Sequence, residues 1–465
     1  MSDKPNILLI VTDQFRYDCM GNSGKYPVKT PNLDMLRNDG KSFTNAYSPI
    51  PTCCPARQTI MSGKTAESLR AYWNYDLFPI DSLTPETETY ISQLKKNGYV
   101  SSYLGKWHVS PDFGPVDFGY DVYTDYSPYY KLLNEKNIVP EYKNGWMGEE
   151  SSLPLEFSPT HWLADTACEE IKRLSSAGAP WHVRIDFNEP HLPCRPSYPF
   201  SRMYDPASVP KWDGFDDDFI YKPYIQKQQL YNWGLQDKTW EDFANTVAMY
   251  YGIISQTDDA IGRVLKYLKD SGLYDDTLII FTSDHGDMCG SHRMMDKHYV
   301  LYDDVVHVPL IVKWSGHIQP GSTDAGFVNN CLSIMPTLLD AAGIEYKSLT
   351  SGKSLLADDV GAKFAVSTYN GQQFGLFTQR MIRTAEWKYI WNTTDIDELY
   401  DMQNDPGELN NLIRNKELLP VVTELRKKLY DYLKTMNDPL VNNEWMQNQL
   451  LNNGKIETYS GENKL

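Results

Sequence analysis

Five short, nearly uninterrupted apolar segments are spread along the first two thirds of the chain, at residues 7–11, 99–104, 182–187, 278–282 and 309–313. Between them lie segments with helical spacing of apolar residues, at 32–38, 87–96, 163–174 and 257–269. Strands that are apolar on both faces and alternate with helices are typical of a mainly parallel sheet with helices on both sides. The sequence therefore predicts an α/β fold with a large, mostly parallel central sheet.

The pattern changes near residue 365. Short strand-like segments follow at 380–384, 387–391 and 398–400, and an amphipathic helix is indicated at about 419–436. Short strands followed by one helix are typical of an α+β unit. We expect two domains, a large one at 1–365 and a smaller C-terminal subdomain at 366–465 with a short antiparallel sheet.

The charge of the chain limits its partners. Its 465 residues include 44 Lys and Arg against 61 Asp and Glu, a formal charge of −17. We expect no nucleic acid partner, because nonspecific phosphate binding needs clustered basic side chains. A small anion in a locally basic pocket remains compatible with this charge.

Export and membrane signals do not stand out in the sequence. The apolar run at 7–11 is interrupted by Asp13, and no later run approaches the roughly 20 residues of a membrane span. The seven cysteines are an odd and scattered set, as in a reducing compartment. These features predict a cytoplasmic protein with no membrane partner, and they do not indicate an oligomeric state.

Two pairs of polar residues follow predicted strands directly. Asp13 and Gln14 come after the first strand, and Asp284 and His285 come after the fourth. Because the carboxyl ends of parallel strands share one edge of a sheet, these side chains can converge. Two carboxylates, an amide oxygen and an imidazole suit Ca²⁺ or Mn²⁺. Capping of the following helices is the alternative interpretation of either pair alone.

A zinc site is a competing interpretation of one histidine-rich segment, which contains His285, Cys289, His292 and His298. Their spacing matches no standard finger or protease helix, and two glycines interrupt any shared helical face. Structural zinc is therefore the weaker hypothesis.

Residues 51–64, PTCCPARQTIMSGK, form the most informative motif. Cys53, Pro55 and Arg57 are spaced as C-x-P-x-R, and Ser-Gly-Lys follows. The segment resembles the signature of the sulfatases, in which the cysteine is oxidised after synthesis to formylglycine. Ala56 stands where serine is commonest in that family.

The resemblance continues in the family's order along most of the chain. The segments that resemble family motifs are 6–13, 30–34, 98–99, 105–108, 190–193, 282–286, 296–297, 399–401 and 404–406. The chain is identified as a member of the formylglycine-dependent (type I) sulfatases, which have the alkaline-phosphatase-like fold. Its two metal pairs are most similar to those of choline sulfatases, phosphonate monoester hydrolases and some bacterial glycan sulfatases.

The resemblance implies a cofactor and a nucleophile. One divalent cation, Ca²⁺ or alternatively Mn²⁺, would be held by Asp13, Gln14, Asp284, His285 and the residue at position 53. A maturation enzyme would convert Cys53 to formylglycine, which is hydrated to a gem-diol. One hydroxyl then attacks sulfur and releases the alcohol, and loss of the proton from the other expels sulfate.

The resemblance also implies a role for each remaining side chain of the site. Arg57 would hold the diol and the metal-binding carboxylates, one helical turn after the nucleophile. Lys106 and Lys297 would bind sulfate oxygens, as a charge-developing transfer requires. His191 would donate a proton to the leaving alcohol, and His108 would act as the base on the second hydroxyl.

The expected activity is hydrolysis of a sulfate monoester, with a small sulfated saccharide as the substrate. Aromatic, basic and amide side chains near the motifs could bind a sugar that carries a carboxylate, namely Arg70, Trp73, Asn74, His182, Arg184 and Arg195. Phosphonate monoesters, phosphodiesters and choline sulfate are alternative substrates. If Cys53 stays unmodified, the chain would instead be a binding protein for a sulfated ligand.

Overall fold

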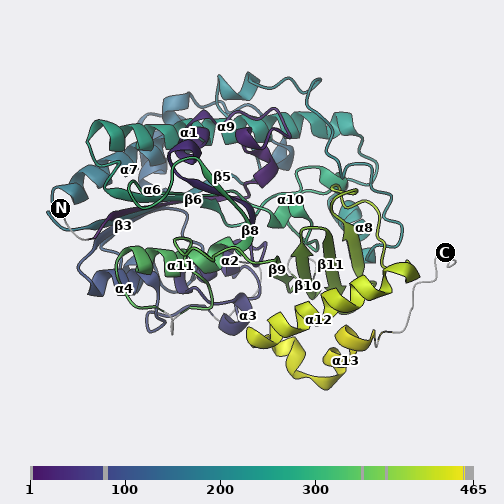
Figure 1. Ribbon diagram of the computed structural model, residues 1–465. Helices are drawn as coiled ribbons and strands as arrows, with labels where there is room; N and C mark the ends of the chain where they lie inside the picture. Colours follow the sequence, from purple (N-terminus) through teal and green to yellow (C-terminus); the bar gives the residue numbers. More distant parts are fainter. Residues whose placement is uncertain (1–3, 77–81, 347–349, 372–374, 454, 456–465) are drawn as a thin grey trace.

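The computed structural model describes residues 4–76, 82–346, 350–371, 375–453 and 455. An eight-stranded sheet runs through the larger part of the molecule, in the order β4-β3-β5-β1-β6-β7-β2-β8 (Figure 1). Its strands are β1 Asn6–Asp13, β2 Lys41–Tyr47, β3 Val100–Gly105, β4 Val122–Thr124, β5 Trp181–Pro190, β6 Thr277–Ser283, β7 Leu310–Lys313 and β8 Ser322–Asn329.

Helices cover both faces of this sheet, as Figure 1 shows. On one face lie α1 Pro31–Asp39, α7 Pro159–Ser175 and α9 Trp240–Asp270, and on the other lie α2 Cys53–Ser62, α4 Tyr90–Lys96 and α11 Asn330–Ala341. Shorter helices are α3 Ala66–Leu69, α5 Pro115–Phe118, α6 Ser127–Glu135, α8 Tyr224–Asn232 and α10 Asp303–Val306.

The central strand shows why the chain folds in these layers. Along β1, Leu8 and Ile10 belong to the hydrophobic core on the α7 and α9 side. Ile7, Leu9 and Val11 belong to the core on the α2 and α11 side. A strand with apolar side chains on both faces needs cover on both faces. β1 is parallel to its neighbours β5 and β6, so the predicted mostly parallel sheet is confirmed, whereas β7 runs antiparallel to β6 and β2.

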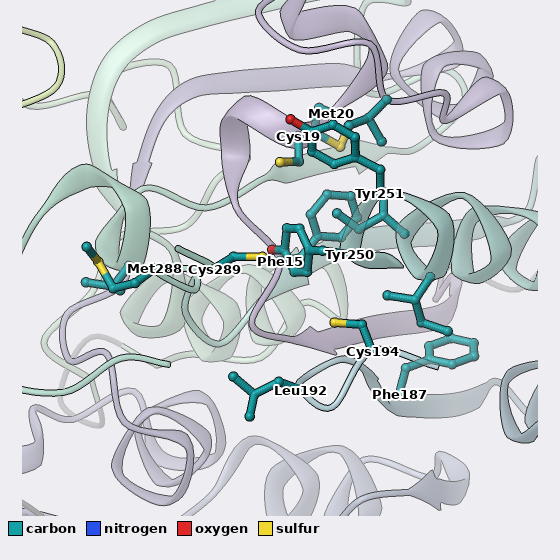
Figure 2. Close-up of a cluster of buried hydrophobic side chains, with 14 of the residues drawn as sticks. Phe15, Cys19, Met20, Phe187, Leu192, Cys194, Tyr250, Tyr251, Met288 and Cys289 are labelled. Atoms are coloured by element: carbon teal, nitrogen blue, oxygen red, sulfur yellow. The ribbon is translucent and has the colours of Figure 1, made fainter. Parts of the chain in front are cut away.

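A packed cluster holds the loop that follows β1 (Figure 2). Phe15, Cys19 and Tyr250 lie in the larger core there. The Tyr250 hydroxyl donates to the backbone oxygen of Gln14 at 2.6 Å and accepts from the backbone N–H of Arg16 at 3.1 Å. Gln14 thereby keeps a left-handed backbone conformation, with φ at 68°. All seven cysteines of the chain are free thiols.

A second sheet is antiparallel and has the order β12-β11-β10-β9. Its strands are β9 Phe364–Tyr369, β10 Gln379–Thr384, β11 Trp387–Asn392 and β12 Glu398–Asp401, and α12 Leu419–Thr435 and α13 Glu444–Asn452 pack with them. The predicted C-terminal α+β subdomain is confirmed. Within the described ranges, no helix has both the length and the apolar character needed to cross a lipid bilayer.

Buried charge joins the two sheets. Lys388 on β11 has a fully buried side chain, and its Nζ lies 2.7 Å from Oδ1 of Asp303 on α10 and 2.7 Å from Oε1 of Glu408. Burial raises the pKa of Glu408 to about 8, although Lys388 opposes this shift. Two carboxylates therefore share one lysine, and Asp303 also lies 3.7 Å from Nε of Arg383.

Lys388→Ala should lower the free energy of unfolding by about 3 kcal/mol, because removal of the lysine leaves the buried carboxylate of Glu408 without its cation. Urea unfolding followed by circular dichroism measures this change. Lys427→Ala is the matched control, since Lys427 pairs with Asp431 on the exposed side of α12 and such pairs contribute little. Equal unfolding midpoints for the two variants would contradict the assignment.

Candidate active site

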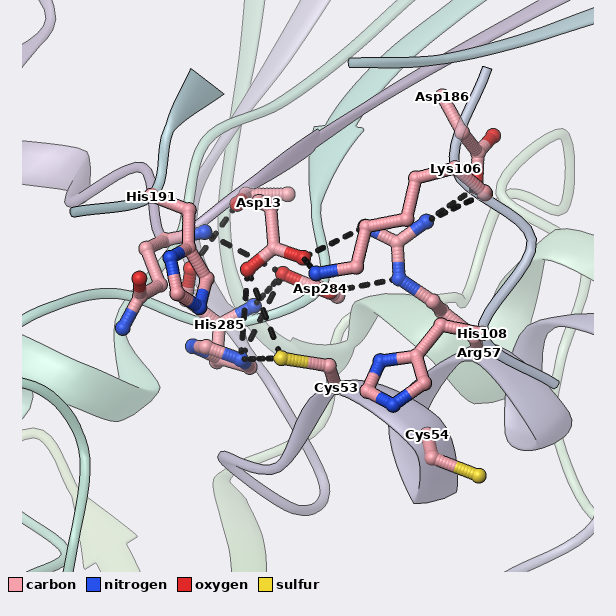
Figure 3. Close-up of polar contacts among 12 residues, drawn as sticks. Asp13, Cys53, Cys54, Arg57, Lys106, His108, Asp186, His191, Asp284 and His285 are labelled. Carbon is pink, nitrogen blue, oxygen red and sulfur yellow. Dashed lines mark hydrogen bonds and ion pairs between the residues drawn. The ribbon is translucent and has the colours of Figure 1, made fainter. Parts of the chain in front are cut away.

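The ends of two strands and the start of one helix meet at a single point (Figure 3). Asp13 ends β1, Asp284 follows β6, and Cys53 is the first residue of α2. Metal-binding atoms of Asp13, Cys53, Asp284 and His285 all lie within 4.8 Å of one another. The thiol of Cys53 is 3.1 Å from Nε2 of His285 and 3.6 Å from Oδ1 of Asp13. The two pairs of residues that follow strands thus converge as expected.

Arg57 ties this cluster together from the second turn of α2. Its fully buried guanidinium donates from Nε to Asp284 Oδ2 at 3.0 Å and from Nη2 to Asp13 Oδ2 at 3.0 Å. Its Nη1 forms an ion pair with a third carboxylate, that of Asp186 near the end of β5. Arg57 therefore joins three strands to one helix.

Asp186 is a member of the site that the sequence analysis missed. Besides Arg57, it accepts hydrogen bonds from Arg184 at 2.7 Å and from the Tyr103 hydroxyl at 2.7 Å. Its signal in the sequence is the same as that of Asp13, a carboxylate near the carboxyl end of an apolar strand. The run at 182–187 conceals this signal because Phe187 continues the apolar pattern beyond the carboxylate.

Two groups of the cluster hold a proton more tightly than usual. Burial and the neighbouring Asp13 raise the pKa of Asp284 to about 6. Burial lowers the pKa of His285, but Asp284 and Cys53 outweigh it and raise the value to about 9. A site that attracts protons in this way also favours a bound cation.

The donor atoms fit a hard divalent cation. The side-chain oxygen of Gln14 is buried without a hydrogen-bond partner, while its Nε2 donates to Asp296. Nδ1 of His285 lies 2.9 Å from the backbone oxygen of Gly286, which can only accept, so Nε2, beside the Cys53 thiol, is the ring atom that can act as a ligand. Carboxylate, amide and imidazole donors together suit Ca²⁺ or Mn²⁺.

The competing zinc group does not assemble around His285. His292 directs its Nδ1 to Asp217 instead. His298 directs its Nε2 to Asp296 at 2.8 Å. Cys289 lies in the hydrophobic core near Tyr250 (Figure 2). These three side chains have structural partners of their own.

Two lysines flank the cluster. Nζ of Lys106 lies 2.6 Å from Asp13 Oδ2, and Nζ of Lys297 lies 3.2 Å from Nε2 of His191. Burial would raise the pKa of Cys53, but Lys297 and Lys106 hold it well below its usual value. The point occupied by the thiol is therefore one where negative charge is stabilised.

Two histidines approach the same point. His191 points Nδ1 at the backbone oxygen of Leu192 at 2.6 Å, which leaves Nε2 directed toward Lys297. His108 has Nε2 at 3.3 Å from Oδ1 of Asp76, and its buried Nδ1 has no hydrogen-bond partner. A hydrogen bond with Asp76 and the charge of Cys53 raise the pKa of His108 against the effect of burial.

Cys54 does not take part in the cluster. Its thiol points away from Asp13 and Asp284 in Figure 3 and lies 3.5 Å from the backbone oxygen of Val109. Its backbone N–H donates to Oδ1 of Asn74 at 2.9 Å. Asn74, predicted as a substrate contact, thus also caps the start of α2.

The other predicted substrate contacts lie in different places. Arg70 is exposed and has a left-handed backbone with φ at 57°, and the Trp73 ring lies 5.9 Å from that of Tyr72. The guanidinium of Arg195 lies over the ring of Tyr142 at 3.8 Å, and its Nε has no hydrogen-bond partner.

His182 and Arg184 are not brought to an open surface, which corrects their placement beside a substrate. His182 pairs with Ile7, at the end of β1 remote from Asp13. Burial and nearby Arg184 lower the pKa of His182 to about 3, so this ring is a neutral core side chain. Arg184 is fully buried and supports Asp186 from behind.

Comparisons with known proteins agree with this geometry. Residues 5–344 match the sulfatase family model, and residues 290–435 match the model for the C-terminal part of N-sulphoglucosamine sulphohydrolase. The chain therefore belongs to the sulfatase family. It is a sulfuric ester hydrolase with the alkaline-phosphatase-like fold, as the sequence motifs predict.

Relatives match over nearly the whole chain. An arylsulfatase of Clostridium perfringens is 28% identical over 475 residues, covering 93% of this chain and 95% of that protein. A choline-sulfatase of Rhizobium meliloti is 29% identical, covering 89% and 83%. The structure of a phosphonate monoester hydrolase from Silicibacter pomeroyi has a TM-score of 0.81 at 24% identity, covering 94% of this chain and 96% of that one.

Asp284→Asn should weaken Ca²⁺ binding by at least about tenfold, because one carboxylate charge is lost from the cation's ligands. Isothermal titration of chelator-treated protein with Ca²⁺ measures the affinity. Asp287→Asn is the control, since Asp287 is equally buried but caps the backbone N–H of Cys289. Unchanged affinity in Asp284→Asn, or equal losses in both variants, would contradict the assignment.

Proposed function

We propose that this protein hydrolyses the sulfate monoester of a small sulfated saccharide, with formylglycine made from Cys53 as its nucleophile. The observation that carries the proposal is the position of Cys53 at the start of α2, where its thiol lies 3.6 Å from Asp13 and the charges of Lys297 and Lys106 lower its pKa. The match of residues 290–435 to the N-sulphoglucosamine sulphohydrolase model supports a saccharide substrate.

The proposed cofactor is Ca²⁺, with Mn²⁺ as the alternative, held by Asp13, Gln14, Asp284, His285 and the residue at position 53. When bound, the cation would lower the pKa of the attacking hydroxyl and stabilise negative charge on sulfate. Arg57 would keep the carboxylates oriented, because each of its three nitrogens already contacts one of them or Asp186.

The remaining side chains have places that suit the expected steps. Lys106 and Lys297 both act electrostatically on position 53 and would bind sulfate oxygens as fixed cations. His191 donates from Nδ1 to the backbone oxygen of Leu192. Its Nε2 can therefore give a proton to the oxygen of the leaving alcohol when the ring is doubly protonated. His108 would accept the proton that remains on the nucleophile, with Asp76 behind its ring as an orienting partner.

Gln14 and His285 favour a second candidate activity. These ligands resemble those of phosphonate monoester hydrolases and choline sulfatases. Phosphonate monoesters and phosphodiesters carry a single negative charge, as sulfate monoesters do, so the same cations could bind them. Maturation by a formylglycine-generating enzyme and a cytoplasmic location remain predictions from the sequence.

Cys53→Ala should abolish turnover of sulfate esters while the fold is retained, because alanine can supply neither an aldehyde nor a thiol. Cys54→Ala is the matched control and should keep turnover, since its thiol faces Val109. Mass spectrometry of the peptide with Cys53, from protein made in the native host, checks the modification. An unmodified thiol there, or full activity in Cys53→Ala, would contradict the mechanism.

A substrate panel separates the candidate activities. Sulfated glucosamines, choline sulfate, 4-nitrophenyl sulfate and bis(4-nitrophenyl) phosphate should be compared by kcat/KM with Ca²⁺ and with Mn²⁺. We expect the saccharide sulfates to be cleaved best, and with Ca²⁺. A higher kcat/KM for the phosphodiester than for the sulfate esters would favour the second candidate activity. Cleavage of 4-nitrophenyl sulfate alone would rule out the saccharide as the substrate.

A further inference from the structure

Asp296 is a carboxylate beside the active site that none of the steps above uses. It lies between β6 and α10, and its side chain is only 7% exposed. Its Oδ1 accepts a hydrogen bond from Nε2 of Gln14 and lies 3.1 Å from Nζ of Lys297. Its Oδ2 lies 2.8 Å from Nε2 of His298. An ionised carboxylate can only accept, so each of these partners acts as a donor toward it.

The backbone around Asp296 fixes where its carboxylate lies. Asp296 has a left-handed conformation with φ at 67°, which is uncommon for a residue other than glycine. Its backbone oxygen accepts from the N–H of Met288 at 2.8 Å. Met288 belongs to the same loop as Asp284 and His285. The Asp296 carboxylate therefore links the loop after β6 to Gln14, which follows β1.

The amide of Gln14 has two ends of similar shape and opposite chemistry. Its oxygen can bind a cation, whereas its NH2 group can only donate hydrogen bonds. The backbone N–H of Gln14 lies 3.3 Å from Oδ1 of Asp284, so this residue borders the metal-binding cluster. Its NH2 group is taken by Asp296, and its oxygen is buried without a hydrogen-bond partner. The oxygen is therefore the end that remains for a ligand.

The reversed amide would be unfavourable at both of its ends. Its oxygen would face the Asp296 carboxylate, so two buried acceptors would meet without a proton between them. Its NH2 group would replace the oxygen as the end available to a cation. A carboxylate at position 14 would need no such control, because both of its ends are oxygen. The requirement for a partner comes from the glutamine.

We propose that Asp296 is a positioning residue that fixes the amide of Gln14 with its oxygen toward the cation site. The inference rests on the proposed function, which makes Gln14 a ligand of Ca²⁺ or Mn²⁺. Asp296 itself binds neither the cation nor the sulfate ester. It acts on cation affinity through the hydrogen bond that it accepts from Nε2 of Gln14.

The test compares two variants that lose the same charge. Asp296→Asn and Asp296→Ala both remove one negative charge near the cation, so this effect cancels between them. Asparagine keeps an oxygen that can accept from Nε2 of Gln14, and alanine does not. The measured quantity is the Kd for Ca²⁺, from isothermal titration of chelator-treated protein with the same modification state at Cys53. Circular dichroism checks that each variant is folded.

Asp296→Ala should bind Ca²⁺ about fivefold more weakly than Asp296→Asn, as expected for the loss of one neutral hydrogen bond. The same two substitutions are then compared in protein that also carries Gln14→Ala. There the two Kd values should be equal, because the amide through which Asp296 acts is absent. A general role of Asp296 in the fold would leave the fivefold difference in place, since effects of independent sites add.

Two results would overturn the inference. One is an equal Kd for Asp296→Asn and Asp296→Ala when Gln14 is present. The other is an undiminished difference between them when Gln14 is replaced by alanine. Failure of the wild-type protein to bind either Ca²⁺ or Mn²⁺ would instead contradict the proposed function, and the inference with it, so the two failures can be told apart.

Discussion

One buried guanidinium holds the functional end of this molecule together. Three carboxylates from three neighbouring strands, Asp13, Asp186 and Asp284, would repel one another in the buried interior, and Arg57 bonds to all three. Burying a charge is costly unless it is paired and hydrogen-bonded. Because Arg57 comes from α2, the same contacts fix where that helix begins, and with it the position of Cys53.

This arrangement also explains how an acidic protein can hold an anion. The chain carries a formal charge of −17, yet Lys106 and Lys297 face a single point beside Cys53. Charges on the remote surface are screened within about 10 Å in salt solution, whereas buried neighbours act at short range and in a lower dielectric. The overall charge therefore does not prevent the binding of one sulfate group.

Much of the fold could be predicted because its central strands are apolar on both faces. Strands β1 and β6 are continuous apolar runs. The position of Asp13 and Asp284 at one edge of the sheet could therefore be predicted from the ends of those runs. Strands β2 and β8, which lie side by side at one end of the sheet, were not predicted, because they contain polar residues at many positions and resemble loops. Helix α9 was predicted only in its second half, although it begins at Trp240, because its first half is buried on nearly all sides and lacks a polar stripe.

Residues of the candidate site could be predicted from the sequence where they belong to a short motif, and not elsewhere. Cys53 and Arg57 belong to one short segment whose spacing is informative by itself. Asp186 belongs to no such motif, so only the fold reveals that its carboxylate reaches Arg57. His182 was wrongly predicted as a substrate contact. It is close in sequence to the site residues, but this does not say which end of the strand its side chain occupies.

The depth of Cys53 restricts when it can be modified. The side chain of Cys53 is 1% exposed. It starts α2 and packs against Asp13, Asp284 and His285, which lie at the ends of β1 and β6. A second protein cannot insert its own catalytic groups into such a space without separating those elements. Any enzyme that oxidises this thiol must therefore reach it while the chain is still open, so chemical maturation competes in time with folding.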